Sequence, residues 1–150
     1  MYKTILVPLD GSGLAEAVLP HVEELARLSG GTILFIQVIE LTHMADQVKG
    51  DVFEALPATT AADVEQHAQE ARRYVDRMVE RERANGIDAR GFVEVGQVVA
   101  TILNAARRES VALIAMASHG RGGQGDVYYG SVAAGVLQRI DRPLLIVRAQ

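Results

Sequence analysis

Residues 116–132, MASHGRGGQGDVYYGSV, join the end of an apolar segment to the start of a helical one. The apolar run 111–117 that leads into them predicts a buried strand. Apolar residues then recur at helical spacing from 131 to 140, with Ser131 where the N-cap of that helix is expected. A buried strand, a glycine-rich turn and a helix in this order are typical of a parallel α/β sheet.

This junction also has the chemistry of an anion-binding site. Its glycines, Gly120 and Gly130 among them, let the backbone turn and approach a ligand closely. The N–H groups of the first helical turn point toward such a ligand, with the positive end of the helix dipole behind them. Arg121 adds a charged donor. The stretch therefore predicts a phosphate-binding loop.

The rest of the chain repeats the alternation of strand and helix. Apolar segments predict strands at residues 2–9, 32–39, 88–95, 111–117 and 144–147. Helical periodicity covers residues 15–28, 62–84, 97–108 and 131–140, with the mixed charges of 62–84 on a solvated face. Pro20 is expected to kink the first helix. Residues 41–61 form a long connection, of the kind that is usually functional or partly disordered.

This alternation predicts one α/β domain over residues 1–150, a doubly wound, Rossmann-like parallel sheet with helices on both faces. Ligands of such sheets bind beyond the carboxyl ends of the strands, where the strand order reverses. Asp10 follows the first strand and the glycine-rich loop follows the fourth. If those strands are neighbours, Asp10 faces residues 120–131. A carboxylate there accepts hydrogen bonds from ribose or holds Mg²⁺ near phosphates, which predicts a nucleotide.

Composition argues against several classes of function. The formal net charge is −4 and lysine occurs only at positions 3 and 49, which argues against a nucleic-acid partner. The absence of cysteine excludes disulfides and thiolate sites and fits a reducing compartment. No apolar run has the length of a membrane span, and the first residues lack the pattern of a signal peptide. We therefore expect a cytoplasmic protein without a membrane partner.

At these residues the chain resembles a single-domain universal stress protein. The resemblance spans the whole length and rests on KTILVPLDGS at 3–12, MASHGR at 116–121, GSVA at 130–133 and RPLLIV at 142–147. ATP-binding members carry a glycine, two residues, a glycine, nine residues and then Gly-Ser or Gly-Thr. Here Gly120 is the second glycine, nine residues separate it from Gly130-Ser131, and Ala117 replaces the first glycine.

The resemblance implies a sheet of order 3-2-1-4-5, of the adenine nucleotide alpha hydrolase-like type, that binds ATP with Mg²⁺ held through the phosphates. It also implies a homodimer formed through the last strand, Leu144–Val147, which would otherwise be an exposed apolar edge. The implied ATP site has Pro8 and Leu9 on the adenine side, Val38 offering backbone groups to the adenine edge, and Asp10 at the ribose. Gly120, Arg121, Gly130, Ser131 and Val132 surround the phosphates. The site also includes Met116, His119 and Ala117, the last at the position where the family's glycine contacts the ribose or adenosine.

Alternatives accompany this prediction of an ATP-binding stress-response module. Residues 120–125 spell the dinucleotide fingerprint G-x-G-x-x-G, but that motif belongs after the first strand and here follows the fourth. A nucleotide-free homodimeric scaffold and a weak ATPase or AMP sensor are the other candidates. Because no catalytic motif is evident, we expect slow hydrolysis at most. Asp10 could instead cap a helix, and His119 could contact phosphate or stabilise the turn.

Overall fold

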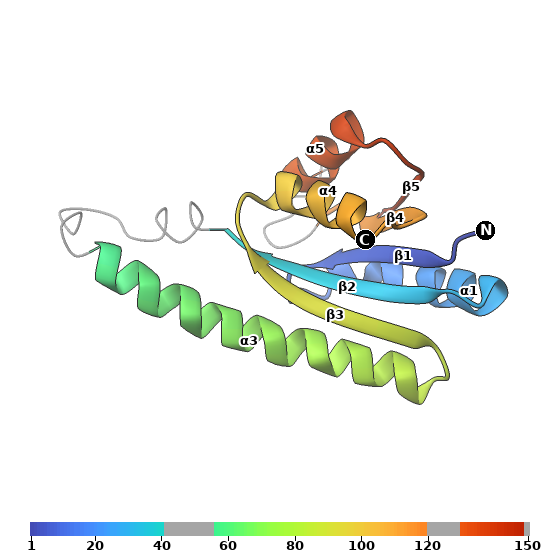
Figure 1. Cartoon of the computed structure of the whole chain (residues 1–150), viewed down its shortest axis with the longest axis horizontal. Coiled ribbons are helices and arrows are strands. Elements are labelled where there is room, and N and C mark those ends of the chain that lie inside the picture. The colour runs from blue at the N-terminus through green and yellow to red at the C-terminus, as the bar shows by residue number, and fades with distance from the viewer. Residues whose placement is uncertain (41–55, 120–129, 149–150) are drawn as a thin grey trace.

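The computed structural model describes residues 1–40, 56–119 and 130–148 (Figure 1). The strands are β1 Thr4–Leu9, β2 Thr32–Ile39, β3 Asp88–Val95, β4 Leu113–Ala117 and β5 Leu144–Val147. The helices are the 3-10 helix η1 Ala15–Val18 and the α-helices α1 Leu19–Ser29, α3 Leu56–Ala84, α4 Val98–Arg108 and α5 Ser131–Arg139. The predicted strands and helices are all present.

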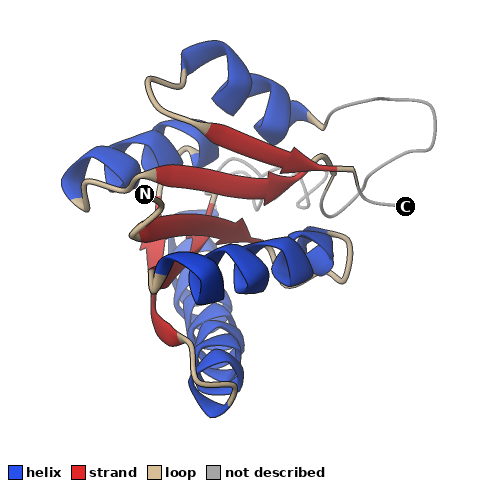
Figure 2. Ribbon diagram, turned by 90° about the vertical axis from the view of Figure 1, so that its right-hand side faces the viewer, coloured by secondary structure: helices blue, strands red, loops and turns tan. Residues whose placement is uncertain are grey.

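The strands form one parallel sheet in the order β3-β2-β1-β4-β5, which confirms the predicted doubly wound fold. Helices cover both faces of this sheet (Figure 2). Because successive side chains of a strand point to opposite faces, the side chains of each inner strand pack into two cores, one on each face of the sheet. In β1, Ile5 and Val7 pack toward α1 and α3, whereas Leu6 packs toward α4 and α5.

Both cores are fully closed to solvent at their centres. Phe35 anchors the core under α1 and α3, and Ile114 anchors the core under α4 and α5; neither side chain has exposed surface. Burying a large apolar side chain of this kind contributes about 1.5–3 kcal/mol. The outer strand β3 is less buried than β1, β2 and β4, as its broken apolar pattern predicts.

Pro20 does not kink a helix, so that prediction was wrong. The α-helical geometry begins at Leu19, and Pro20 lies in the first turn of α1. A backbone N–H has no intrahelical acceptor in the first turn, so its absence from proline costs nothing there. The residues before it form the separate 3-10 helix η1. Gly30 ends α1 in the left-handed conformation, with φ of 65°, as the Gly30-Gly31 pair predicts.

The long helix α3 begins at Leu56, six residues before the predicted start at residue 62. Pro57 falls in its first turn, which is the one place where a helix accepts proline without loss. Figure 1 shows these first turns extending beyond the carboxyl edge of the sheet. Residues 41–55 lie outside the described residues. The charged face of α3 has an exception to its predicted solvation, because Glu82 is completely buried.

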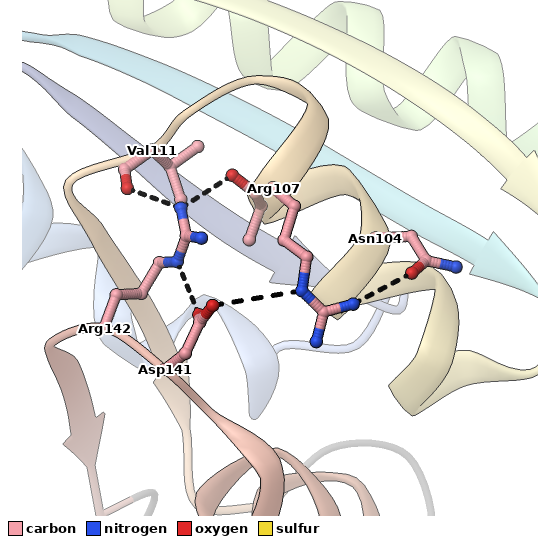
Figure 3. Close-up of polar contacts among 6 residues, drawn as sticks. Asn104, Arg107, Val111, Asp141 and Arg142 are labelled. Carbon is pink, nitrogen blue, oxygen red and sulfur yellow. Dashed lines mark hydrogen bonds and ion pairs between the residues drawn. The ribbon is translucent and has the colours of Figure 1, made fainter.

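Arg142 cross-links the amino edge of the sheet (Figure 3). Its Nη1 donates to the carbonyl oxygens of Ala106, at 2.8 Å, and Val111, at 2.9 Å. Its Nε donates to Oδ1 of Asp141 at 2.9 Å, and Nε of Arg107 lies 3.9 Å from Oδ2 of the same carboxylate. The segment 141–143 is thereby tied to the end of α4 and to the segment that leads into β4.

Candidate functional site

The strands β1 and β4 are neighbours, as the crevice hypothesis requires. Their ladder covers the pairs Ile5↔Leu113 and Leu6↔Ile114. The ladder between β1 and β2 runs further, from Thr4↔Thr32 to Leu9↔Gln37. The β1–β4 ladder therefore ends before the carboxyl ends of both strands, at the point where the strand order reverses. This is where open parallel sheets bind ligands.

Asp10 follows β1 directly and forms a tight turn with Ser12. Its Oδ1 accepts from the backbone N of Ser12 at 2.8 Å and from the hydroxyl of Ser12 at 2.6 Å. Ser12 Oγ in turn accepts from the backbone N of Ala15 at 3.2 Å, at the start of η1. Gly11 adopts φ of 85°, which glycine accepts without strain. The N-cap position of η1 is Leu14, which makes no side-chain cap bond. Ser12 instead accepts from the first residue of η1, and Asp10 holds Ser12 in place.

Ser118 joins the end of β4 to two other elements through its backbone. Its N donates to the carbonyl oxygen of Val147 in β5 at 2.7 Å. Its carbonyl oxygen accepts from the N of Gly130 at 2.7 Å. A Cβ atom on Gly130 would lie 3.2 Å from that carbonyl oxygen, closer than most Cβ contacts. The glycine therefore permits the close approach of α5 to the end of β4.

The N-cap of α5 is Gly130 rather than Ser131, which corrects the sequence prediction. Gly130 has extended backbone angles, and its carbonyl oxygen accepts the first helical bond from Ala134 N at 3.0 Å. Ser131 is the first helical residue and is exposed. Serine is the better N-cap by its side chain, but here the bond from Gly130 N to Ser118 decides where the helix begins.

His119 lies at the border of the described residues. Its Nδ1 is 3.1 Å from the hydroxyl of Ser118, a contact that stabilises the turn. Its Nε2 is buried and has no hydrogen-bond partner among the described residues. The contact to Ser118 supports the turn-stabilising role, while Nε2 is left for a further interaction.

The other predicted residues lie at the same edge of the sheet but on different faces. Met116 belongs to the core under α4 and α5, and the partly buried Val38 packs against it. Val38 lies one residue beyond the end of the β1–β2 ladder. The side chain of Leu9 packs into the opposite core, so only its backbone faces the carboxyl edge. Pro8 is partly buried and Ala117 is buried. Val132 packs against the core under α4 and α5. Gly120 and Arg121 lie outside the described residues.

Sequence reasoning missed Ser12 and Ser118, which hold Asp10 and Gly130 in place. The signal for Ser12 was present in the triplet Asp10-Gly11-Ser12, because an aspartate commonly bonds the backbone two residues on. Ser118 acts through its backbone, so no side-chain pattern marks it. In the described part of the chain no group of three His, Asp or Glu side chains is placed to bind a metal. None of the helices described here has the length and apolar character needed to cross a membrane.

The sequence and the structure of this chain are both similar to those of known proteins. The sequence model of the universal stress protein family matches residues 1–148. Universal stress protein MJ0577 of Methanocaldococcus jannaschii is 27% identical over 158 residues, covering 99% of this chain and 96% of the relative. A solved structure of MJ0577 superposes with a TM-score of 0.86 at 25% identity, covering 100% of this chain and 98% of that one.

Two more distant solved structures share the fold. A universal stress protein in complex with cAMP has a TM-score of 0.64 at 20% identity, with 99% of this chain and 98% of that chain covered. A universal stress protein family protein of Arabidopsis thaliana with AMP bound has a TM-score of 0.68 at 14% identity, with 99% and 92% covered. At these identities the likeness shows the fold alone.

Proposed function

The chain belongs to the universal stress protein family, and on that premise we propose that it is a nucleotide-binding signalling module of the cytoplasmic stress response. It binds ATP, with Mg²⁺ on the phosphates, beyond the carboxyl ends of β1 and β4. Asp10 accepts hydrogen bonds from the ribose, and the N-terminus of α5 receives the phosphates. Nucleotide occupancy shifts the population of a partner-binding surface.

The observation that carries this proposal is the hydrogen bond of 2.7 Å from Gly130 N to the Ser118 carbonyl oxygen. It brings the N-terminus of α5 to the end of β4, and β4 is the neighbour of the strand that leads into Asp10. The N–H groups of Ser131, Val132 and Ala133 have no acceptor within the helix, because an α-helix leaves its first donors unpaired. These donors and the helix dipole favour a phosphate group.

An adenine nucleotide is supported by the cAMP and AMP named for two universal stress proteins of the same fold. Each of those ligands carries a single phosphorus, so they also favour a second candidate function, a sensor of adenosine monophosphates. The separation of Gly120 from Gly130-Ser131, which resembles the ATP-binding members, favours the triphosphate. We expect Mg²⁺ to bind through phosphate oxygens, since the described residues offer no cluster of protein ligands for it.

The direct test is calorimetric titration of nucleotide-stripped protein with ATP, AMP and cAMP, each with and without Mg²⁺. Binding of ATP in the micromolar range, about −8 kcal/mol, with tighter binding in Mg²⁺, is the expected result. Tighter binding of AMP or cAMP than of ATP selects the sensor. Absence of heat and of any shift in melting temperature with every nucleotide overturns the proposal in favour of the nucleotide-free scaffold.

The role of Asp10 is tested by two substitutions. Asp10→Ala is expected to weaken ATP binding by about 1–3 kcal/mol, because a charged acceptor for the ribose hydroxyls is lost. Asp10→Asn keeps an oxygen that accepts from Ser12 and so preserves the turn. If Asp10→Asn binds ATP as tightly as wild type while Asp10→Ala does not, ATP binding depends on an acceptor oxygen at residue 10 and not on its negative charge.

We also propose that two copies pair through β5. This strand ends the sheet, and its four residues, Leu144–Val147, are apolar and only half-buried. An open apolar edge of this kind favours pairing with another strand. Sedimentation equilibrium over a range of concentrations is expected to give the mass of a dimer. A monomer mass at all concentrations contradicts this arrangement.

A further inference from the structure

Polar contacts on two successive residues of η1, Ala15 and Glu16, lead from the Asp10 turn to α3. Asp10 holds Ser12, and Ser12 accepts from the backbone N of Ala15 at the start of η1. The next residue, Glu16, accepts a hydrogen bond of 2.8 Å at Oε2 from the hydroxyl of Tyr74 in α3. The turn after β1 is therefore attached to a helix that lies more than fifty residues away in the sequence.

Tyr74 is suited to be a permanent donor in this series. Its side chain is buried at the rim of the core, where it packs with residues of β1 and η1. Burial raises the pKa of Tyr74 above its usual value, and the hydrogen bond to Glu16 and the negative charges of Glu16 and Asp10 raise it further, against the opposing effect of Arg77. The phenol thus keeps its proton and donates to Glu16 at any physiological pH.

The polar contacts that join α3 to η1 and to α1 differ in what they hold. The bond from Tyr74 to Glu16 reaches η1, whose first residue donates its backbone N–H to Ser12 in the Asp10 turn. The ion pair of Arg81 with Glu23, 3.3 Å from Nη2 to Oε1, reaches α1 further along the chain. The first contact can affect the orientation of Asp10, whereas the second joins α3 to α1 away from it.

We propose that Tyr74 and Glu16 are positioning residues, which hold η1 and thereby orient the Asp10 carboxylate toward the ribose of the bound nucleotide. This inference rests on the proposed function, because it assigns Asp10 to the ribose hydroxyls. A hydrogen bond to a hydroxyl depends on the acceptor being held within a fraction of an ångström, so loss of the support from α3 reduces the ribose contact selectively.

The test compares affinities for ATP and for 2′,3′-dideoxy-ATP, which lacks both ribose hydroxyls, by calorimetry in Mg²⁺. We expect wild type to prefer ATP about tenfold, and Tyr74→Phe to lower that preference to about threefold or less, with unchanged affinity for the dideoxy nucleotide. Tyr74→Phe keeps the buried ring and removes only the hydroxyl. Glu16→Ala is expected to behave in the same way.

Two control variants separate positioning from general stability. Glu16→Gln keeps an oxygen that accepts from Tyr74 and is expected to retain the preference for ATP. Arg81→Gln breaks the ion pair of α3 with Glu23 in α1 and is expected to retain the preference too, even if the melting temperature falls. Equal loss of affinity for both nucleotides in Tyr74→Phe, or the same loss of preference in Arg81→Gln, overturns the inference.

The wild-type result separates this inference from the proposed function. If wild type binds neither nucleotide, the proposed function fails and the positioning role fails with it. If wild type binds both equally, nucleotide binding stands but Asp10 makes no ribose contact, and the positioning role is overturned. If wild type prefers ATP and Tyr74→Phe keeps the full preference, only the positioning role is wrong.

Discussion

The two edges of the sheet differ in how their polar groups are satisfied. At the amino edge, Arg142 donates to two carbonyl oxygens and to Asp141, which also pairs with Arg107 (Figure 3). At the carboxyl edge, Nε2 of His119 and Oε1 of Gln37 are buried without a hydrogen-bond partner in the described part of the chain. A buried polar atom without a partner costs about 1–3 kcal/mol.

Under the proposed function, stability and ligand binding depend on opposite edges of the same sheet. The amino edge is completed by the chain's own side chains, and a substitution there should change the free energy of unfolding while leaving ligand affinity alone. The carboxyl edge carries helix donors and buried polar atoms that have no partner among residues 1–40, 56–119 and 130–148. Substitutions there should change affinity more than stability.

Gly130→Val gives the largest expected effect and tests whether the carboxyl edge governs ATP affinity. The new Cβ would lie 3.2 Å from the Ser118 carbonyl oxygen, and the branched side chain would displace the N-terminus of α5. We expect ATP affinity to fall by about 100-fold or more, with a loss of stability of about 1 kcal/mol. Calorimetry and urea unfolding measure the two quantities.

The matched control for Gly130→Val is Gly135→Ala in the same helix. A Cβ on Gly135 would lie 2.7 Å from Cγ2 of Val99, so this substitution strains the packing of α5 on α4 without touching the N-terminus. We expect reduced stability with nearly unchanged affinity. Equal loss of affinity in both variants would mean that general loosening of α5, and not the Gly130 junction, governs binding.

Arg142→Ala tests the amino edge. Removing the guanidinium leaves the carbonyl oxygens of Ala106 and Val111 without their donor, in a region where the Arg142 side chain is only 18% exposed. We expect a loss of about 3 kcal/mol in the free energy of unfolding, with unchanged ATP affinity, measured by urea unfolding and calorimetry. A loss of affinity comparable to that of Gly130→Val would remove the separation between the two edges.

Glu82 is an exception to the difference between the two edges, since it is a buried acid near the amino edge. It is fully buried near the end of α3, and neither of its carboxylate oxygens accepts a hydrogen bond from the part of the chain that the structure describes. Once protonated, it can donate to the neighbouring Glu23. Burial and the carboxylate of Glu23 raise the pKa of Glu82 to about 7, and Arg81 opposes the shift. The amino edge therefore also contains one carboxyl group, that of Glu82, whose protonation depends on burial and on neighbouring charges.

The pH dependence of stability follows from this raised pKa. The contribution of neutral Glu82 is fully present below the unfolded pKa of about 4.5 and is lost as pH rises through about 7. Glu82→Gln stays neutral at every pH, so we expect it to be about 2 kcal/mol more stable than wild type at pH 8 and nearly equal at pH 4.5. Urea unfolding at the two pH values measures this. A constant difference between the proteins would assign the effect to packing.

Ser131→Ala gives the smallest expected effect. Because Gly130 is the N-cap, the exposed hydroxyl of Ser131 caps nothing in the helix, and its removal should cost less than about 0.5 kcal/mol of stability. If the hydroxyl contacts phosphate, ATP affinity falls by about 1 kcal/mol in calorimetry. A stability loss near 1 kcal/mol would instead restore Ser131 to a capping role.

The elements of the fold could be predicted from the sequence because apolar runs and helical periodicity mark them directly. The start of α3 and the N-cap of α5 were misplaced because both depend on context that the pattern of residues does not show. Pro57 resembles a helix breaker in isolation, but a first turn accepts it, and Ser131 is a better cap than glycine until the bond from Gly130 N to Ser118 is known. Periodicity likewise cannot tell which charge of α3 lies beneath α1, so the burial of Glu82 was missed.

The candidate site could be predicted in part. Asp10 follows β1, and β1 and β4 are neighbours, as the sheet order implied by the family resemblance requires. The residues that support them were not foreseen, because Ser118 acts through its backbone and Tyr74 reaches Glu16 from a distant helix. Tertiary contacts of these kinds leave no periodic pattern. The predicted roles of Gly120 and Arg121 stay predictions.

The junction at Ser118 is held by backbone hydrogen bonds and not by side chains. Two backbone hydrogen bonds, to Val147 and from Gly130, tie β4 to β5 and α5, and neither bond requires a particular side chain at residue 118 or 147. Gly130 differs from them, because a Cβ there would lie 3.2 Å from the Ser118 carbonyl oxygen. This corner of the molecule therefore depends on backbone geometry and on one missing side chain.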